Sequence, residues 1–405
     1  MTAYRIRETT EVLLNALHNM PVVVLSGLRQ SGKSTLLLKQ PELKRRRYIS
    51  FDDFNSLEAA RINPDGIISG SAPVTIDEAQ KLPGILTFIK QSVDKKRIPG
   101  RFLLSGSANF LLLKNIAESL AGRAVYLTLH PFSRREITGS TKELPALVYF
   151  INKGVFPQKD VKPIASREII KGGMPSICLN EVKEPAIWFR GYEQTYLERD
   201  IRSLSQVADL VPFRHLLRLI SLRNAQILKQ SELARDAKLN VMTANRYLSL
   251  IETSFVISRL APHLRNRSSR LIKSPKLYLS DTGLACYLAG IEKLDASEPL
   301  AGAMMENYVY QNLNSILSAY HPEAKITYWS IQGRYEVDFI IEIGSETIAI
   351  EVKAGSRWQE RDLTGLKAFL NTSRKCRVGI LAYNGTQTTQ LADRIWAIPI
   401  GLLLS

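Results

Sequence analysis

Residues 27–34 read GLRQSGKS, and this stretch decides the fold of the first part of the chain. It fits the pattern Gly-x-x-x-x-Gly-Lys-Ser/Thr, a glycine loop that wraps backbone N–H groups around phosphate oxygens. The apolar run 22–25 before it is typical of a buried parallel strand, and residues 35–38 after it begin a helical pattern. A strand, a glycine loop and a helix in this order predict a phosphate-binding P-loop.

The residues of this loop have distinct expected roles. Gly27 and Gly32 let the backbone bend so that amide groups converge on the phosphates, and the helix N-terminus adds a favourable dipole. Lys33 is expected to reach the β- and γ-phosphates, and the Ser34 hydroxyl to hold Mg²⁺. The predicted nucleotide-binding residues are Gly27, Leu28, Arg29, Gln30, Ser31, Gly32, Lys33, Ser34 and Thr35.

A second motif supplies the rest of an ATP site. Residues 74–78 read VTIDE, a short apolar strand that ends in two carboxylates. An aspartate at this place helps to hold Mg²⁺ in P-loop NTPases, so we expect Asp77 to be a metal ligand. Glu78 is then placed to polarise the attacking water. ATP and Mg²⁺ are therefore the predicted cofactors.

Two later features are candidates for contacts with the γ-phosphate. Residues 101–109 read RFLLSGSAN, an apolar strand followed by small polar residues. Ligands lie at the carboxyl ends of parallel strands, so Ser107 and Asn109 are candidate sensors, and a serine that only caps the next helix is the alternative. Arg123 is a candidate to act on phosphate in its own or a neighbouring subunit, with a structural salt bridge as the alternative.

The motifs between Gly27 and Glu136 resemble the ATPase domain of a widespread prokaryotic family of AAA-type proteins. The matching stretches are residues 27–36, 76–83, 104–108, and 120–123 followed by 130–133. The resemblance implies an AAA-type nucleotide switch or motor, and members typically carry a C-terminal domain that resembles restriction endonucleases. Because such ATPases often form rings, it also implies a homo-oligomer in which Arg123 or Arg134 completes the neighbour's site.

The charge of the chain favours a polyanionic partner. The formal net charge is +16, and residues 200–276 hold 14 Lys and Arg against 5 Asp and Glu. Such a basic segment predicts contact with nucleic acid, either DNA or RNA, and a solvated basic surface is the alternative.

Other classes of protein are disfavoured by composition. The three cysteines and five histidines show no metal-ligand spacing. No apolar run reaches the roughly 18 residues that span a bilayer, and residues 1–10 do not resemble a signal peptide. We therefore expect a cytoplasmic protein with no membrane partner.

The middle of the chain is expected to be helical and then to form a winged helix-turn-helix. Residues 141–225 match the helical lid of the ATPase family. A short helix over 231–237 with a serine N-cap, a turn at 238–240, a helix over 243–252 and a strand over 255–260 follow. This order predicts a second helix that presents Thr243, Asn245 and Arg246 to a DNA major groove, and the basic loop 263–270 would grip phosphates. Docking of a protein is the alternative.

The C-terminal part carries a constellation of charged residues on strands. Asp338 lies on one predicted strand, and Glu351 and Lys353 share a face of the next, because side chains two apart point the same way. If a hairpin brings them together, Asp338 and Glu351 would hold Mg²⁺, Lys353 would offset developing charge, and Glu306 would add a ligand from its helix. This order resembles the PD-(D/E)xK nuclease superfamily.

The sequence thus predicts an α/β protein in four segments. They are an AAA-type P-loop ATPase core at 1–140, a helical lid at 141–225, a winged helix-turn-helix at 226–270 and a PD-(D/E)xK nuclease-like domain at 271–405. The leading predicted function is Mg²⁺-dependent ATP hydrolysis coupled to DNA. An ATP-gated nuclease and a non-catalytic, nucleotide-switched binding or scaffold protein, whose basic patch would meet a protein or RNA, are the alternatives; which protein would be the partner is unknown.

Overall fold

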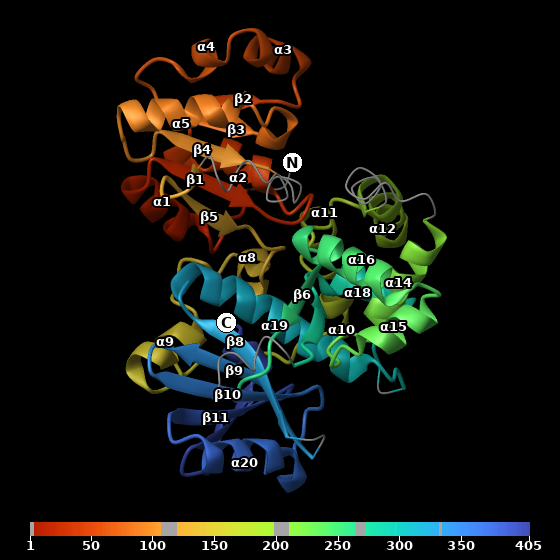
Figure 1. Ribbon diagram of the computed structural model, residues 1–405. Coiled ribbons are helices and arrows are strands. Elements are labelled where there is room, and N and C mark those ends of the chain that lie inside the picture. Colours follow the sequence, from red (N-terminus) through yellow and green to blue (C-terminus); the bar gives the residue numbers. More distant parts are fainter. Residues whose placement is uncertain (1–3, 107–119, 198–209, 265–272, 296, 332–333) are drawn as a thin grey trace.

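The computed structural model describes residues 4–106, 120–197, 210–264, 273–295, 297–331 and 334–405. These residues form three lobes: an N-terminal α/β lobe, a C-terminal α/β lobe and a mostly helical lobe at their side (Figure 1). Within the described residues, no helix is both long and apolar enough to cross a membrane.

The N-terminal lobe is built on a five-stranded parallel sheet in the order β2-β3-β4-β1-β5. The strands are β1 (Val22–Ser26), β2 (Arg47–Ser50), β3 (Val74–Asp77), β4 (Phe102–Ser105) and β5 (Ala124–Thr128). The helical elements are α1 (Thr10–Asn19), α2 (Lys33–Lys39), α3 (Phe54–Ile62), α4 (Pro64–Ile68), α5 (Ile85–Lys95), and the 3₁₀ turns η1 (Pro41–Leu43) and η2 (Ala79–Lys81).

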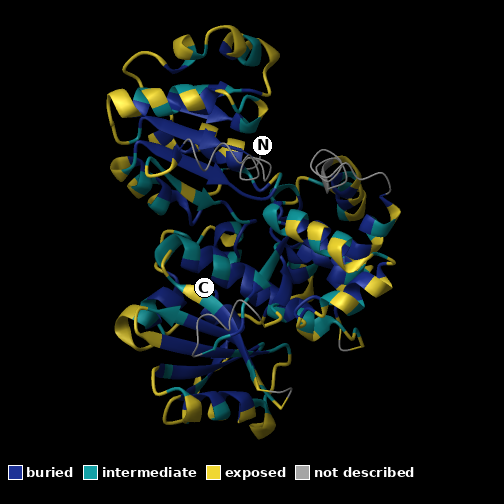
Figure 2. Ribbon diagram, viewed as in Figure 1, coloured by how far each residue is buried: buried dark blue, intermediate teal, exposed yellow. Residues whose placement is uncertain are grey.

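Apolar side chains on both faces explain why this sheet lies inside the lobe. Val22 and Val24 pack on one side, and Val23 and Leu25 on the other. Strands covered on both faces read as continuous hydrophobic runs, as β1, β3 and β4 do. Figure 2 shows these strands buried, with the exposed residues on the outer helices.

The helical lobe contains a helix-turn-helix followed by a two-stranded antiparallel sheet. Its elements are α10 (Ser166–Lys171), α11 (Pro175–Cys178), α12 (Pro185–Tyr192), the π-turn η3 (Glu193–Leu197), α14 (Val211–Leu222), α15 (Gln230–Asp236), α16 (Val241–Thr253), β6 (Ile257–Leu260), β7 (Lys276–Leu279) and α18 (Thr282–Ala289). The side chain of Asn240 caps α16 by accepting a hydrogen bond from Thr243 N. The predicted serine cap of α15 is wrong, because the helix begins at Gln230 and Lys229 takes the N-cap position.

The C-terminal lobe has a six-stranded mixed sheet in the order β12-β13-β11-β10-β9-β8. The strands are β8 (Lys325–Ile331), β9 (Tyr335–Ile343), β10 (Glu346–Lys353), β11 (Cys376–Tyr383), β12 (Thr389–Ala392) and β13 (Ile395–Pro399), and the helical elements are α19 (Ala301–Tyr320), η4 (Glu360–Leu363), α20 (Thr364–Thr372) and α21 (Ile400–Leu403). Strands β9 and β10 pair antiparallel, which confirms the predicted hairpin.

An early segment of the chain also packs on the C-terminal lobe. Helix α9 (Ala146–Lys153) contacts α21, and Arg377 donates to the carbonyl oxygen of Ile151 over 2.9 Å. The Asn384 side chain bonds both the N–H and the carbonyl of Ile164, over 2.6 and 3.0 Å. The sequence predicts a lid over 141–225, but Ile151 and Ile164 within this range bond to side chains of the C-terminal lobe.

Helix α19 joins the two α/β lobes (Figure 1). Its Asn312 accepts a hydrogen bond from the N–H of Arg134, which begins the short helix α8 (Arg134–Thr138) after the N-terminal sheet. Further along α19, the Ser318 hydroxyl lies 3.2 Å from Nε2 of His130. The start of the same helix carries Glu306, so one rigid element connects the N-terminal lobe to the carboxylates described below.

Candidate active site and carboxylate cluster

The P-loop lies at the carboxyl end of β1, between β4 and β5. The chain leaves β1 for one edge of the sheet and returns to its other side with β5, so β1 is a topological switch point, where ligands of open α/β sheets bind. Strand β3 ends at Asp77 at the same edge. The two predicted motifs of the ATP site therefore meet at one edge of the sheet.

Close backbone approach explains the first glycine of the loop. Gly27 has φ +145°, and a Cβ there would lie 2.3 Å from the carbonyl oxygen of Leu129. Gly32 has φ +94°, another conformation that side chains rarely adopt. Ser34 and Thr35 are exposed at the start of α2.

Lys33 is buried beneath the loop. Its ammonium donates to the carbonyl oxygens of Gly27 and Leu28, over 3.0 and 2.9 Å. Burial lowers the pKa of Lys33 to about 8, and the charges of Glu78 and Asp77 partly oppose that shift. Lys33 therefore lies within electrostatic reach of both predicted catalytic carboxylates, and among the described residues its ammonium donates to neutral carbonyl groups.

Asp77 is held by a residue that the sequence analysis missed. The Tyr48 hydroxyl on β2 donates to Asp77 Oδ2 over 2.7 Å, and Asp77 Oδ1 accepts from the Glu78 N–H over 3.1 Å. The available signal was a polar residue on the strand that pairs with β3.

Glu78 adopts a backbone conformation that is uncommon for a side chain of its type. Its φ is +55°, in the left-handed region, and such strain is often found at functional sites. The Gln80 amide donates to the Glu78 carboxylate. Burial, with the charge of Asp77, raises the pKa of Glu78. A carboxylate with a raised pKa is a stronger base than a free one.

Arg7 is a second residue that the sequence did not indicate, and its side chain stabilises the P-loop by hydrogen bonds. Its guanidinium donates to the carbonyl oxygens of Ser31 (2.8 Å) and His130 (2.6 Å) and pairs with Glu136 at 3.0 Å. The side chain is 3% exposed. No motif in the sequence marks Arg7, because all of its partners are distant in the chain.

Ser107, Asn109 and Arg123 are the predicted contacts with the γ-phosphate. Ser107 and Asn109 lie outside the described residues. Arg123 precedes β5, at the amino end of the sheet and away from the P-loop, and it forks onto Asp94 with contacts of 2.5 and 2.9 Å. A role of Arg123 at its own P-loop is therefore wrong: a salt bridge holds it. Action on a neighbouring subunit stays a prediction.

The four charged residues predicted in the C-terminal lobe come together. Asp338 on β9 accepts a hydrogen bond from the Val352 N–H of β10 over 2.9 Å, and Lys353 pairs with Glu351 at 2.8 Å. With Glu336, which also faces this site, we name Glu306, Glu336, Asp338 and Glu351 the carboxylate cluster.

A lysine that the sequence analysis did not select enters this cluster. The ammonium of Lys276, on β7, lies 2.9 Å from Glu306, 2.5 Å from Glu336 and 3.1 Å from Asp338. Burial alone would lower the pKa of Lys276, but the charges of Asp338, Glu306 and Glu336 outweigh it and raise the pKa. The signal was a lysine at the start of the otherwise apolar strand 276–279.

Two carboxylates of the cluster, Glu306 and Glu351, have raised pKa values. Burial, followed by the charge of Asp338, raises the pKa of Glu306 and of Glu351. The Tyr278 hydroxyl, two residues along β7 from Lys276, donates to Glu306 over 2.5 Å.

Comparisons with known proteins divide the chain into three matched regions. An AAA domain matches residues 19–138. Domains of unknown function match residues 164–295 (DUF8612) and 301–403 (DUF4143). The N-terminal lobe is therefore an AAA-type P-loop ATPase domain.

Solved structures resemble the chain in part. The Walker-type ATPase paby2304 of Pyrococcus abyssi is 15% identical, covers 69% of this chain over 94% of its own, and gives a TM-score of 0.41. The RuvB Holliday junction branch migration motor of Thermotoga maritima is 16% identical, covers 62% of this chain over 88% of its own, and gives a TM-score of 0.28.

Two mycobacterial proteins are similar over nearly the whole chain. They are the uncharacterized proteins Rv2008c of Mycobacterium tuberculosis and Mb2031c of Mycobacterium bovis, each 31% identical over 404 residues, which is 98% of this chain and 84% of theirs. The chain belongs to the family of these two proteins.

Proposed function

We propose that this protein is a Mg²⁺-dependent ATPase whose nucleotide cycle controls contact with DNA. The observation that carries the proposal is the convergence of Lys33, Asp77 and Glu78 at the switch point of the N-terminal sheet. In this assignment Lys33 turns from its two carbonyl partners to the phosphates of ATP. That exchange replaces neutral partners with charged ones, and charge-assisted hydrogen bonds are the stronger kind.

The donors at this site fit Mg²⁺. A carboxylate and a hydroxyl are the hard oxygen ligands that this ion prefers, and Asp77 and the exposed Ser34 provide them. When bound, the ion would offset the negative charge of the phosphates. Tyr48 holds the Asp77 carboxylate in place through its hydrogen bond.

Glu78 is the residue assigned to the attacking water. Its buried carboxylate is oriented by Gln80 and by its own left-handed backbone. The raised pKa suits a group that accepts a proton or a hydrogen bond from water.

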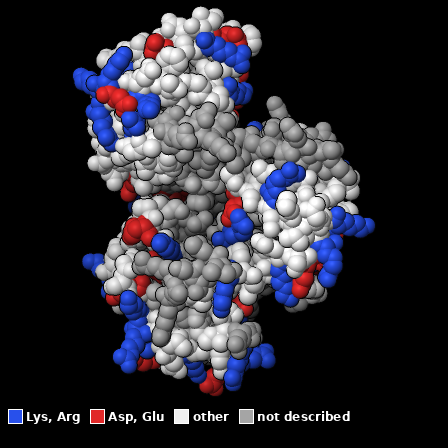
Figure 3. Space-filling model, viewed as in Figure 1, with Lys and Arg blue, Asp and Glu red and all other residues white. Residues whose placement is uncertain are grey.

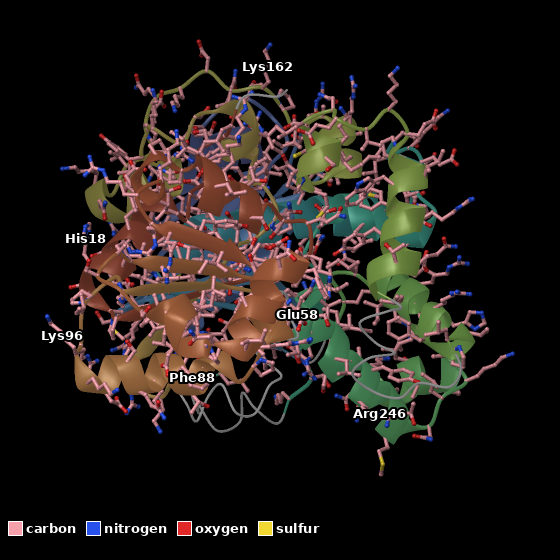
Figure 4. The ribbon with its side chains drawn as sticks, turned by 90° about the horizontal axis from the view of Figure 1, so that it is seen from above. His18, Glu58, Phe88, Lys96, Lys162 and Arg246 are labelled. Atoms are coloured by element: carbon pink, nitrogen blue, oxygen red, sulfur yellow. The ribbon has the colours of Figure 1, made fainter. Side chains whose placement is uncertain are left out.

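The test of hydrolysis is phosphate release by Glu78→Gln, which keeps the shape of the side chain. Turnover should fall to background while ATP binding persists. Glu58→Gln is the matched control, because Glu58 lies on α3 of the same lobe and pairs with Arg61 at the surface (Figure 4). Equal turnover in Glu78→Gln and wild type would overturn the assignment.

The contact with DNA is assigned to the helical lobe, read as a winged helix-turn-helix. Support comes from α15, the turn and α16, which are followed by the β6–β7 pair with the basic loop 263–270 between the strands; residues 265–272 lie outside the described residues. Figure 3 shows Lys and Arg side chains spread over this lobe. Arg246 is exposed on α16 (Figure 4), Thr243 is half-buried, and Asn245 has a buried side-chain oxygen, so Arg246 is the best placed of the three predicted contacts.

Binding of a labelled duplex at several salt concentrations tests this assignment. Arg246→Ala should weaken binding and reduce the salt slope by about one if the arginine contacts phosphate. Lys96→Ala is the control, because Lys96 lies on the N-terminal lobe, far from α16 in Figure 4. Affinity that does not change with salt would contradict a phosphate-dominated contact.

A homo-oligomer is part of the proposal, with Arg123 acting on the nucleotide of a neighbour. The support is its position away from the P-loop of its own chain. Mixing Arg123→Ala chains with Lys33→Met chains tests this action in trans. The first variant keeps an intact P-loop, and the second keeps the arginine that would act on it. Restored turnover is expected, and turnover that stays at the level of the separate variants would contradict action in trans.

A metal-dependent nuclease is the second candidate function. Its support is the assembly of Glu306, Asp338, Glu351 and Lys353, the set that the resemblance to the PD-(D/E)xK superfamily selects. Lys276 is the observation against it, since an ammonium already lies among these carboxylates. Incubation of plasmid with Mg²⁺ or Mn²⁺, with and without ATP, decides: equal nicking by wild type and Asp338→Ala would exclude the site.

A further inference from the structure

The centre of the carboxylate cluster is taken by a side chain from another lobe. Lys276 starts β7, the strand that pairs with β6 beside the helix-turn-helix, yet its ammonium points among carboxylates of α19 and β9. The Lys276 side chain is 3% exposed. An ammonium has three N–H donors, and three carboxylates lie within 3.1 Å of it. Two of these contacts, with Glu306 and Asp338, are hydrogen bonds, and the third, with Glu336, is an ion pair.

Several oxygens that would bind a metal are also engaged, whereas Oε2 of Glu351 is buried without a hydrogen-bond partner among the described residues. Glu306 Oε1 accepts from both Lys276 and the Tyr278 hydroxyl. Asp338 gives one oxygen to Lys276 and the other to the Val352 N–H of β10. Glu351 Oε1 accepts from Lys353. A divalent cation would have to break several of these bonds and lie beside an ammonium of like charge.

We infer that Lys276 is the resident cation of the carboxylate cluster and that this cluster binds no divalent metal in the folded protein. The donor set suits Mg²⁺ by chemical type but does not accept it while Lys276 is present. The cluster then serves as an ionic joint that fixes β7 of the helical lobe to the C-terminal sheet. The inference goes beyond the ATPase proposal and does not depend on it.

Metal binding without nucleotide tests the inference directly. Mn²⁺ is added to the full-length protein, and bound Mn²⁺ is counted by electron paramagnetic resonance. Wild type and Asp338→Asn should bind equally, because the cluster holds no metal in either. Lys276→Met should gain one Mn²⁺ per chain, and the double variant Lys276→Met, Asp338→Asn should lose it again.

Matched variants keep the outcome decisive. Lys273→Met removes an exposed lysine three residues away and should behave as wild type. Lys276→Gln removes the charge but keeps N–H donors, and serves if Lys276→Met fails to fold. Wild-type binding of one Mn²⁺ that Asp338→Asn abolishes would overturn the inference, and so would a folded Lys276→Met or Lys276→Gln that binds none. Because nucleotide is absent, a failed ATPase proposal would leave these results unchanged.

Discussion

Two buried lysines in the described part of the chain lie near carboxylates, and their partners differ. Lys33 donates to two backbone carbonyls, and burial lowers its pKa to about 8. Lys276 pairs with three carboxylates, and its pKa is raised because their charges outweigh burial. The first lysine is held by weak partners that a phosphate can replace. The second is held by three charged carboxylates, which are stronger partners than carbonyl groups.

The contrast shows that residue types alone do not identify a metal site. Both sites combine lysine with aspartate and glutamate at strands of an α/β sheet. Only at the P-loop does the lysine leave the carboxylates available. The predictions below therefore exchange or remove these partners.

Removal of Lys276 should have the largest effect on stability. Lys276→Met leaves buried carboxylates without their cation, and breaking a buried pair in this way costs about 3–5 kcal/mol. Urea unfolding should show this loss, whereas Lys273→Met should not. Added Mn²⁺ should restore part of the lost stability of Lys276→Met and should not stabilise the other proteins. Stability equal to wild type would mean that the ion pairs of Lys276 contribute nothing to the free energy of unfolding.

Removal of Lys33 should have the opposite signature. Lys33→Met should lower ATP turnover by roughly 100-fold or more, since it deletes a charge placed at the phosphates. Its unfolding free energy should stay close to that of wild type, because only two neutral hydrogen bonds are lost. A large loss of stability with intact turnover would reverse the comparison between the two lysines.

Loss of the Tyr48 hydroxyl should have an intermediate effect. Tyr48→Phe leaves Asp77 without the partner that orients it, and loss of such a supporting residue typically costs ~10-fold in metal affinity or activity. Turnover as a function of Mg²⁺ concentration measures it. Tyr126→Phe is the control, because that hydroxyl lies on the edge strand β5 and the residue is 40% exposed. An unchanged Mg²⁺ dependence would show that Asp77 needs no support.

The smallest effect concerns His130, where the N-terminal lobe meets α19. Burial, with Arg7, lowers the pKa of His130 to about 4, so the folded protein favours the neutral ring. The stability from this group is fully present above a pH of about 6.5 and is lost as the pH falls toward 4. Between pH 7 and pH 5, the unfolding free energy of wild type should therefore fall further than that of His130→Gln, by on the order of 1 kcal/mol. Urea unfolding at the two pH values measures this difference. Parallel pH profiles would exclude His130 as the cause.

The sequence predicted mostly those parts of the two sites that are local in the chain, and Glu306, from a separate helix, is the exception. Residues 27–34 and 74–78 are consecutive motifs, and the β9–β10 hairpin brings Asp338 to Glu351 over a short loop. Lys276 was missed because it contacts Glu306 and Asp338 across 30 and 62 residues and belongs to a different lobe. Arg7 and Tyr48 were missed for the same physical reason: their partners are set by the packed fold and not by spacing.

The start of α15 and the lobe to which residues 146–164 belong were also not predictable from local sequence. The cap of α15 was predicted from one serine, but the helix starts a residue earlier and uses no side-chain cap. Residues 146–164 have a helical pattern that fits a lid, and it is the packing of α9 on α21 and the hydrogen bonds to Arg377 and Asn384 that assign them to the C-terminal lobe. The residue pattern of a segment indicates which helix or strand it forms. The elements that it packs against depend on residues far along the chain.

The attachment of α9 to the last lobe has a consequence for how the protein is made. Ile164 leaves the ribosome 220 residues before Asn384, its hydrogen-bond partner. At typical rates of translation, this interval lasts roughly ten to forty seconds. During that time the apolar face of α9 has no native surface to cover it, so the nascent chain is open to chaperones and to misassembly while its ATPase lobe can already fold.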